Sequence, residues 1–282
     1  MGLRDIGGKN VIALTDALEA FALTDTGLAR DHNEDAVFVD PTSGLAILAD
    51  GMGGYNAGEV ASGMAVSILS EALRRDFAAG LLHGAERRGD AGCSERTLLE
   101  RISMANSAIL RASLNESEYA GMGTTLVAAV FHDNRVTVAH LGDSRLYRLR
   151  GGELRVVTRD HSLLQEQIDA GLVTPREACY YDKSLVTRAL GVEARPNTES
   201  HTYSTRPGDL YLLCSDGLND MVDGCDILKA LLGASRELGP TAECLIRMAN
   251  DNGGYDNVSV ILVRVLRDFP ASRESQEPVG LD

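Results

Sequence analysis

The chain has 282 residues, 44% of them hydrophobic and 24% charged, which is ordinary for one large globular domain. Its formal net charge of -14 repels phosphate polyanions and argues against nucleic acid as a partner. The apolar runs are too short to span a membrane, and the amino terminus lacks the layout of a secretion signal. Five scattered cysteines without a C-x-x-C pair favour reduced thiols over disulfides or a zinc site. We therefore expect a cytoplasmic protein with no membrane partner.

The predicted strands and helices occur in separate groups along the chain. Short apolar runs bounded by turn residues predict strands at 20–24, 36–39, 45–49, 124–131, 136–141, 146–150, 154–157, 210–214 and 258–265. Apolar residues at helical spacing predict helices from about 57 to 76, 94 to 113 and 240 to 250. Because the strands occur in hairpin-like runs and do not alternate strictly with helices, antiparallel sheets with helices outside them are favoured over a doubly wound parallel sheet.

Acidic residues adjoin the ends of four of these apolar runs. They occur in the pairs Asp50-Gly51, Gly142-Asp143, Asp216-Gly217 and Asp256-Asn257. A single Asp-Gly pair is usually a turn with a local hydrogen bond, but a carboxylate at the mouth of a buried strand is rigidly placed, and four of them could converge. Converging carboxylates repel one another unless cations offset their charge, and such hard oxygen ligands select magnesium or manganese. The pattern therefore indicates a divalent-metal site with catalytic chemistry.

An ordered set of motifs makes this indication specific. It consists of Arg30-Asp31-His32-Asn33-Glu34-Asp35, Asp50-Gly51-Met52-Gly53-Gly54, Gly58-Glu59-Val60-Ala61-Ser62, Gly121-Met122-Gly123-Thr124-Thr125, Gly142-Asp143-Ser144-Arg145, Asp160-His161-Ser162, Thr187-Arg188-Ala189-Leu190-Gly191, Cys214-Ser215-Asp216-Gly217-Leu218 and Asp256-Asn257-Val258-Ser259-Val260. In order and spacing, from about residue 20 to 266, the set resembles the bacterial branch of the metal-dependent protein phosphatases of the 2C type. No single motif carries the resemblance.

The resemblance implies a fold and a domain plan. The fold would be α+β, a four-layer α-β-β-α sandwich of two antiparallel sheets flanked by helices, with a small flap subdomain. The phosphatase domain would cover residues 20–268 with its flap at about 163–184, preceded by an extension at 1–19 and followed by a flexible tail at 269–282. His161 is expected to position the start of the flap segment and not to touch substrate.

The resemblance also implies a reaction and its residues. Phosphoserine and phosphothreonine on proteins would be hydrolysed by a water activated at two Mn²⁺ or Mg²⁺ ions, without a phosphoenzyme. Asp50 would bridge the ions, the Gly51 carbonyl would complete one site, and Asp216 and Asp256 would hold the other. Glu34 and Asp35 would act through metal-bound water, Arg30 would pair with the phosphate, and Asp143 with Asp216 would bind a weaker third metal. Met52 stands where relatives outside the bacterial branch carry a proton-donating His, so the general acid must be another group.

Two alternatives remain beside this hypothesis. The chain would be a catalytically silent relative that binds phosphorylated partners as a regulatory module, or a phosphatase for small phosphoesters. The presence of Asp50, Asp216 and Asp256 speaks against the first. The natural partners of the active enzyme would be phosphorylated proteins and a bacterial Ser/Thr kinase.

Overall fold

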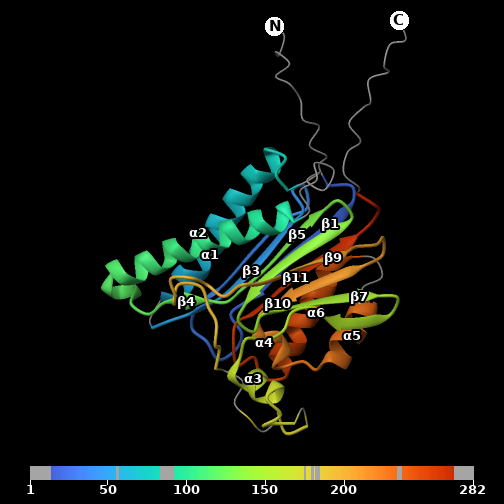
Figure 1. The fold of residues 1–282 in the computed structure, drawn as a ribbon. Helices are drawn as coiled ribbons and strands as arrows, with labels where there is room; N and C mark the ends of the chain where they lie inside the picture. Colours follow the sequence, from blue (N-terminus) through green and yellow to red (C-terminus); the bar gives the residue numbers. More distant parts are fainter. Residues whose placement is uncertain are drawn as a thin grey trace, which may run out of the picture.

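A computed structural model gives the fold of the chain, and the structure describes residues 14–269 except 55–56, 83–91, 175, 179–180, 182–184 and 234–236. Two β-sheets stack face to face, and helices cover both outer faces (Figure 1). The four-layer α-β-β-α sandwich is therefore confirmed. No helix in the described ranges has the length and apolarity needed to cross a membrane.

The first sheet has the strand order β1-β11-β10-β7-β8 and is antiparallel throughout. Its strands are β1 (Leu18–Asp25), β11 (Val258–Val265), β10 (Leu210–Cys214), β7 (Arg145–Arg150) and β8 (Glu153–Val156). Chain-distant strands are neighbours here, because β1 pairs with β11 from Leu18↔Val265 to Asp25↔Val258. The amino-terminal strand thus lies beside the carboxyl-terminal one.

The second sheet has the order β2-β3-β5-β6-β9 and is also antiparallel. Its strands are β2 (Asp35–Asp40), β3 (Leu45–Met52), β5 (Leu126–His132), β6 (Arg135–Leu141) and β9 (Glu199–Ser204), and the short β4 (Gly123–Thr124) pairs with the end of β3. The sequence pattern missed β9, because this edge strand is polar and its residues are half-buried or exposed.

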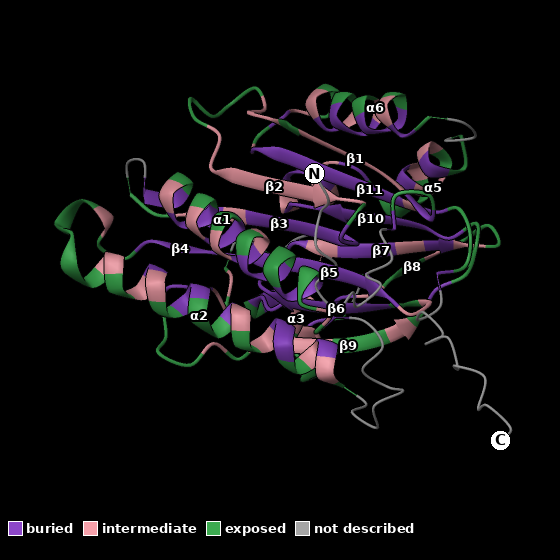
Figure 2. Cartoon of the chain, turned by 90° about the horizontal axis from the view of Figure 1, so that it is seen from above, coloured by how far each residue is buried: buried purple, intermediate pink, exposed green. Residues whose placement is uncertain are grey.

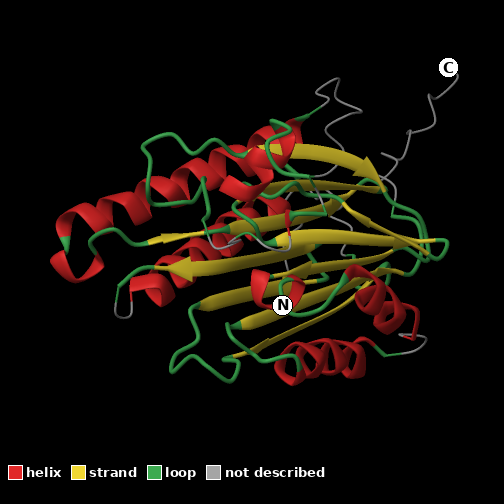
Figure 3. Cartoon of the chain, turned by 90° about the horizontal axis from the view of Figure 1, so that it is seen from below, coloured by secondary structure: helices red, strands yellow, loops and turns green. Residues whose placement is uncertain are grey.

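In the described part of the chain, helices cover the outer faces of both sheets. Helices α1 (Ala57–Ala78) and α2 (Cys93–Asn115) lie over the second sheet, whereas α4 (Asp216–Asn219), α5 (Gly224–Gly233) and α6 (Leu238–Asp251) lie over the first (Figures 1 and 3). Helix α3 (Leu163–Asp169) lies in the segment predicted as the flap. Two outer apolar cores fill the helix–sheet layers and a third lies between the sheets. Figure 2 shows the buried strands at the centre and helices buried along one face only.

The predicted domain boundaries need adjustment at both ends. Leu14, Ala17 and Leu18 are buried in the core between the sheets, so residues 14–19 belong to the domain and not to an extension. Phe269 is also buried, and its carbonyl accepts a hydrogen bond from the backbone N–H of Asn134, which places residue 269 in the domain as well. Residues 1–13 and 270–282, and part of the predicted flap, lie outside the described residues.

Candidate metal centre

Four acidic residues from the two sheets stand at the same end of the sandwich. Asp35 begins β2, and it is the direct cross-strand partner of Asp50 near the end of β3. Asp216 follows β10 at the start of α4, and Asp256 precedes β11 by two residues. Because β10 and β11 are antiparallel neighbours, the end of one lies beside the start of the other. Each sheet thus brings two carboxylates to one end of the interface.

The electrostatics of these carboxylates show that they form one cluster. Burial raises the pKa of Asp50 well above its usual range, and the charges of Asp35, Asp216, Asp143 and Asp256 raise it further. The pKa of Asp216 is raised in the same way, by burial first and then by Asp143 and Asp256. Burial is also the main reason why the pKa of Asp35 rises to about 6. These mutual effects show that the carboxylates lie near enough to one another for their charges to interact through the buried end of the sandwich.

Three carboxylate oxygens in this region are buried and have no hydrogen-bond partner among the described residues. They are Oε1 of Glu34, Oδ1 of Asp35 and Oδ1 of Asp216. A buried carboxylate oxygen without a donor costs free energy comparable to a lost hydrogen bond, and neighbouring negative charges add to that cost. Bound cations remove both penalties, and an all-oxygen ligand set suits magnesium or manganese. The residues present therefore fit divalent metal ions.

Buried polar side chains hold Asp35 and Asp50 in place. The Ser215 hydroxyl donates to Oδ2 of Asp35 at 2.8 Å and accepts from the backbone N–H of Ser259 at 2.9 Å. The backbone N–H of Asp50 donates to Thr125 Oγ1 at 3.1 Å, and Thr124 Oγ1 donates to the Asp50 carbonyl at 2.9 Å. The position of the unpartnered Oδ1 of Asp35 is therefore fixed by the hydrogen bond to Oδ2 and by the pairing of β2 with β3.

Asn257 fixes the loop that carries Arg30 and Glu34. Its Oδ1 accepts from the Glu34 N–H at 2.8 Å, and its Nδ2 donates to the carbonyls of Thr26 and His32 at 2.9 Å each. Sequence reasoning did not assign a role to Asn257 or Ser215, although a polar residue buried at the end of an apolar strand is the signal that could have found them.

Close packing explains the glycines around Glu34. A Cβ on Gly51 would lie 2.1 Å from the Gly58 carbonyl oxygen, and a Cβ on Gly58 would lie 2.5 Å from Glu34 Oε1. The Gly51 N–H also donates to the Glu34 carbonyl at 3.0 Å. Glycine at both positions lets β3, the first turn of α1 and the Glu34 loop come together.

Arg30 and Asp143 complete the predicted set. The half-exposed Arg30 Nη2 donates to Asp256 Oδ2 at 2.7 Å, so this guanidinium stands directly at the carboxylate cluster. Asp143 lies in the β6–β7 turn, and burial with the charge of Asp160 raises its pKa to about 6. Its charge also raises the pKa values of Asp50 and Asp216. All eight predicted site residues, Arg30, Glu34, Asp35, Asp50, Gly51, Asp143, Asp216 and Asp256, are brought to one region.

A second group of potential ligands, His140, His161 and Glu199, lies beside the Asp143 turn. Their donor atoms lie within 4.8 Å of one another, and the two imidazole rings stack at 4.7 Å. However, a neutral imidazole has a single lone pair, and the Gly142 N–H donates to His161 Nδ1 at 3.3 Å, so that Nε2 carries the hydrogen and faces Glu199 Oε2 at 3.4 Å. Burial lowers the pKa of His161 to about 4, so the ring is neutral. The backbone of His161 also bonds to Gly142 and Thr187, so this residue joins the Asp143 turn to the segment before Arg188.

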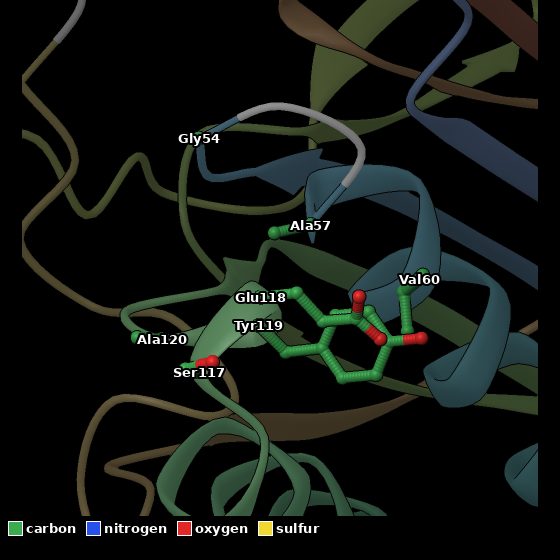
Figure 4. A pocket seen from close by; sticks show the side chains of 7 residues that line it. All are labelled: Gly54, Ala57, Val60, Ser117, Glu118, Tyr119 and Ala120. Carbon is green, nitrogen blue, oxygen red and sulfur yellow. The ribbon is translucent and has the colours of Figure 1, made fainter.

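A pocket of about 610 Å³ lies next to the loop that follows Gly51, but none of the clustered carboxylates of the candidate metal centre lines it. Its lining residues come from the β3–α1 loop, the first turn of α1 and the 3₁₀ turn η2 (Ser117–Tyr119): Gly54, Ala57, Val60, Ser117, Glu118, Tyr119 and Ala120. Figure 4 shows the Glu118 and Tyr119 side chains extending from η2 toward Val60. This pocket is separate from the candidate metal centre.

Comparisons with known proteins agree with the geometry. The family described as protein phosphatase 2C matches residues 29–245. The serine/threonine phosphatase stp of Listeria monocytogenes serotype 4b (strain F2365) is 40% identical over 244 residues, which cover 85% of this chain and 93% of the relative. The crystal structure of the Mycobacterium tuberculosis serine/threonine phosphatase PstP/Ppp superimposes with a TM-score of 0.78 at 38% identity, covering 89% of this chain and 100% of that one. A structure of the PstP catalytic domain in complex with two manganese ions gives 0.76 at 39% identity, with coverages of 89% and 99%.

Proposed function

This chain belongs to the protein phosphatase 2C family, and we propose that it hydrolyses phosphoserine and phosphothreonine on proteins with the help of two divalent cations, Mn²⁺ or Mg²⁺. The observation that carries the proposal is the cluster of inter-sheet carboxylates, in which buried oxygens of Glu34, Asp35 and Asp216 have no hydrogen-bond partner among the described residues. The names of the relatives and the two manganese ions of the PstP structure support it.

In this proposal, Asp50 would contribute to holding both cations, the Gly51 carbonyl would help to hold one, and Asp216 and Asp256 would hold the other. Asp35 and Glu34 contribute through their unpartnered oxygens, and Asp143 with Asp216 provides a weaker third site. Bound cations would offset the charge of the carboxylates and would supply a water whose pKa is lowered toward neutrality.

The chain's own residues orient the substrate and keep the site in shape. Arg30 offers two parallel donors to two phosphate oxygens, and its half-exposed position lets it leave Asp256 for an incoming phosphate. Ser215 keeps Asp35 oriented, and Asn257 keeps the Arg30–Glu34 loop against β11. The contacts of Ser215 and Asn257 lie within the protein and do not involve substrate, so they would pre-organise Asp35 and the loop for the reaction.

The test is hydrolysis of a phosphothreonine peptide with and without manganese by the wild type, by Asp216→Asn and by Asp251→Asn. Asp251 is an exposed acid at the end of α6 and serves as the matched control. We expect manganese-dependent phosphate release that Asp216→Asn abolishes and Asp251→Asn retains. A folded, metal-loaded wild type without turnover would contradict the proposal and favour the silent binding module. Turnover of small phosphoesters alone would favour the second alternative.

The same proposal includes a bacterial Ser/Thr kinase as the opposing enzyme and the cytoplasm as the location. Phosphorylated proteins must be made by such a kinase before this enzyme can act on them. Cys93, Cys214, Cys225 and Cys244 are free thiols, which is typical of a reducing compartment. Deleting the gene should raise the phosphothreonine content of cytoplasmic proteins, and an unchanged phosphothreonine profile would contradict this part of the proposal.

A further inference from the structure

Two exposed apolar side chains stand beside the Arg30–Asp256 ion pair. Leu28 is 70% exposed and lies two residues before Arg30, and Tyr255 is 67% exposed and lies directly before Asp256. A Cβ on Gly254 would meet Leu28 Cγ at 2.8 Å, and a Cβ on Gly253 would meet the Tyr255 ring at 2.7 Å. Both side chains therefore lie against the same Gly253–Gly254 segment. We call Leu28 and Tyr255 together the apolar lip.

The backbone beneath the lip is held by several hydrogen bonds. The N–H groups of Leu28 and Ala29 both donate to the Gly254 carbonyl, at 2.8 and 3.1 Å. Gly27 has φ +76°, and a Cβ there would lie 2.2 Å from the Asp256 carbonyl oxygen, so the two loops touch through their backbones. The backbone that carries the lip is thus fixed, so a ligand that packs there has to order only the two side chains.

We propose that the apolar lip binds a hydrophobic side chain of the phosphoprotein substrate close to the phosphorylated residue. This inference rests on the proposed function, because it takes Arg30 as the phosphate partner. Two residues span at most about 7 Å of chain, so the lip lies within reach of the same substrate segment as Arg30. An extended peptide rises about 3.3 Å per residue and repeats its facing side every second residue, which points to the second position on either side of the phosphorylated residue.

The size of the lip fits a peptide side chain and not a second copy of the chain. A stable dimer interface buries about 800 Å² on each partner, which two side chains do not supply. A leucine-sized side chain, in contrast, can pack on one aliphatic and one aromatic neighbour and lose part of its exposed surface. Removing that much apolar surface from water is expected to change substrate preference by about tenfold.

The test uses two phosphothreonine peptides that differ only in having leucine or serine at the second position before and after the phosphorylated residue. The measured quantity is the ratio of kcat/KM for the leucine peptide to that for the serine peptide. Because both peptides are measured on the same preparation, any change in folding or metal loading cancels in the ratio. The variants are Leu28→Ser, Tyr255→Ser and the double variant, and Leu232→Ser on α5 is the matched control, since Leu232 is 54% exposed.

We expect a wild-type ratio of about ten, carried mainly by KM, a ratio near one in the double variant and the wild-type ratio in Leu232→Ser. A wild-type ratio near one, or a ratio that the double variant leaves unchanged, would overturn the proposed lip while leaving the phosphatase function intact. Absence of turnover with both peptides in manganese-loaded wild type would instead overturn the proposed function, and the lip with it.

Discussion

Replacing Asp143 by asparagine is expected to stabilise the metal-free protein at neutral pH. This carboxylate is 5% exposed, and burial together with the charge of Asp160 raises its pKa from 3.8 to about 6. The folded state therefore holds the proton more tightly than the unfolded state, and stability falls as the pH rises from about 4 to about 6. The loss is complete once the pH lies about one unit above the folded-state pKa of about 6.

The size of the effect follows from the pKa. A rise of about two pH units corresponds to about 3 kcal/mol at about 1.4 kcal/mol per unit. Asparagine has nearly the same shape and stays neutral, so Asp143→Asn should raise the free energy of unfolding at pH 8 by about 2–3 kcal/mol. The gain should shrink as the pH falls and should approach zero only below the unfolded-state pKa of 3.8, where the wild-type carboxyl is protonated in both states.

The assay is urea unfolding with EDTA present, at several pH values between 4.5 and 8. Glu243→Gln, which removes an exposed charge on α6, is the control and should stay within about 0.5 kcal/mol of the wild type at every pH. An Asp143→Asn protein that is no more stable than the wild type at pH 8, or whose gain does not depend on pH, would refute the reasoning that buried like charges destabilise this site.

Two further substitutions probe the packing and the hydrogen bonds of the site. Gly58→Ala should lower manganese-dependent activity on the order of tenfold or more, because the new Cβ would stand 2.5 Å from Glu34 Oε1. Gly63→Ala is the control in the same helix, since a Cβ on Gly63 would meet no atom within 4 Å. It should keep activity and raise the free energy of unfolding by about 0.5–1 kcal/mol. Equal activity of the two alanine variants would show that Glu34 is not held in place by this packing. Ser215→Ala should cost about 1–3 kcal/mol in urea unfolding with EDTA, because Asp35 Oδ2 and the Ser259 N–H lose their partner, and an unchanged unfolding free energy would contradict that role.

Local patterns in the sequence were enough to predict most of the elements. Apolar runs and helical spacing located β1, β2, β3, β5, β6, β7, β8, β10 and β11 with α1, α2 and α6, although β8 is mostly exposed and the predicted run 124–131 did not separate β4 from β5. The edge strand β9 has the sequence Glu199–Ser204 without a continuous apolar face, and neither α4 nor α5 was given bounds beforehand. Helix α6 begins at Leu238, two residues before the predicted start at Pro240.

The acidic residues of the candidate site were predictable from the sequence, whereas the residues that hold them in place by hydrogen bonds were not. Asp50, Asp143, Asp216 and Asp256 stand at strand ends, a position that a periodic pattern reveals. The Ser215–Asp35 hydrogen bond joins residues 180 positions apart, and the Asn257–Glu34 bond joins residues 223 apart. Such pairs depend on how the two sheets stack, which no local pattern specifies.

The stacking of the sheets has a thermodynamic consequence of its own. Asp35 and Asp50 belong to one sheet, whereas Asp216 and Asp256 flank strands of the other, and the spacing between them is set by inter-sheet contacts such as the edge-on rings of Phe131 and Tyr211, 5.3 Å apart. Cations held by all four carboxylates would resist any sliding of one sheet over the other. By reciprocity, a small substitution deep in that apolar layer would weaken cation affinity from a distance. When a core substitution lowers the activity of this protein, the first measurement should therefore be whether the variant needs a higher manganese concentration.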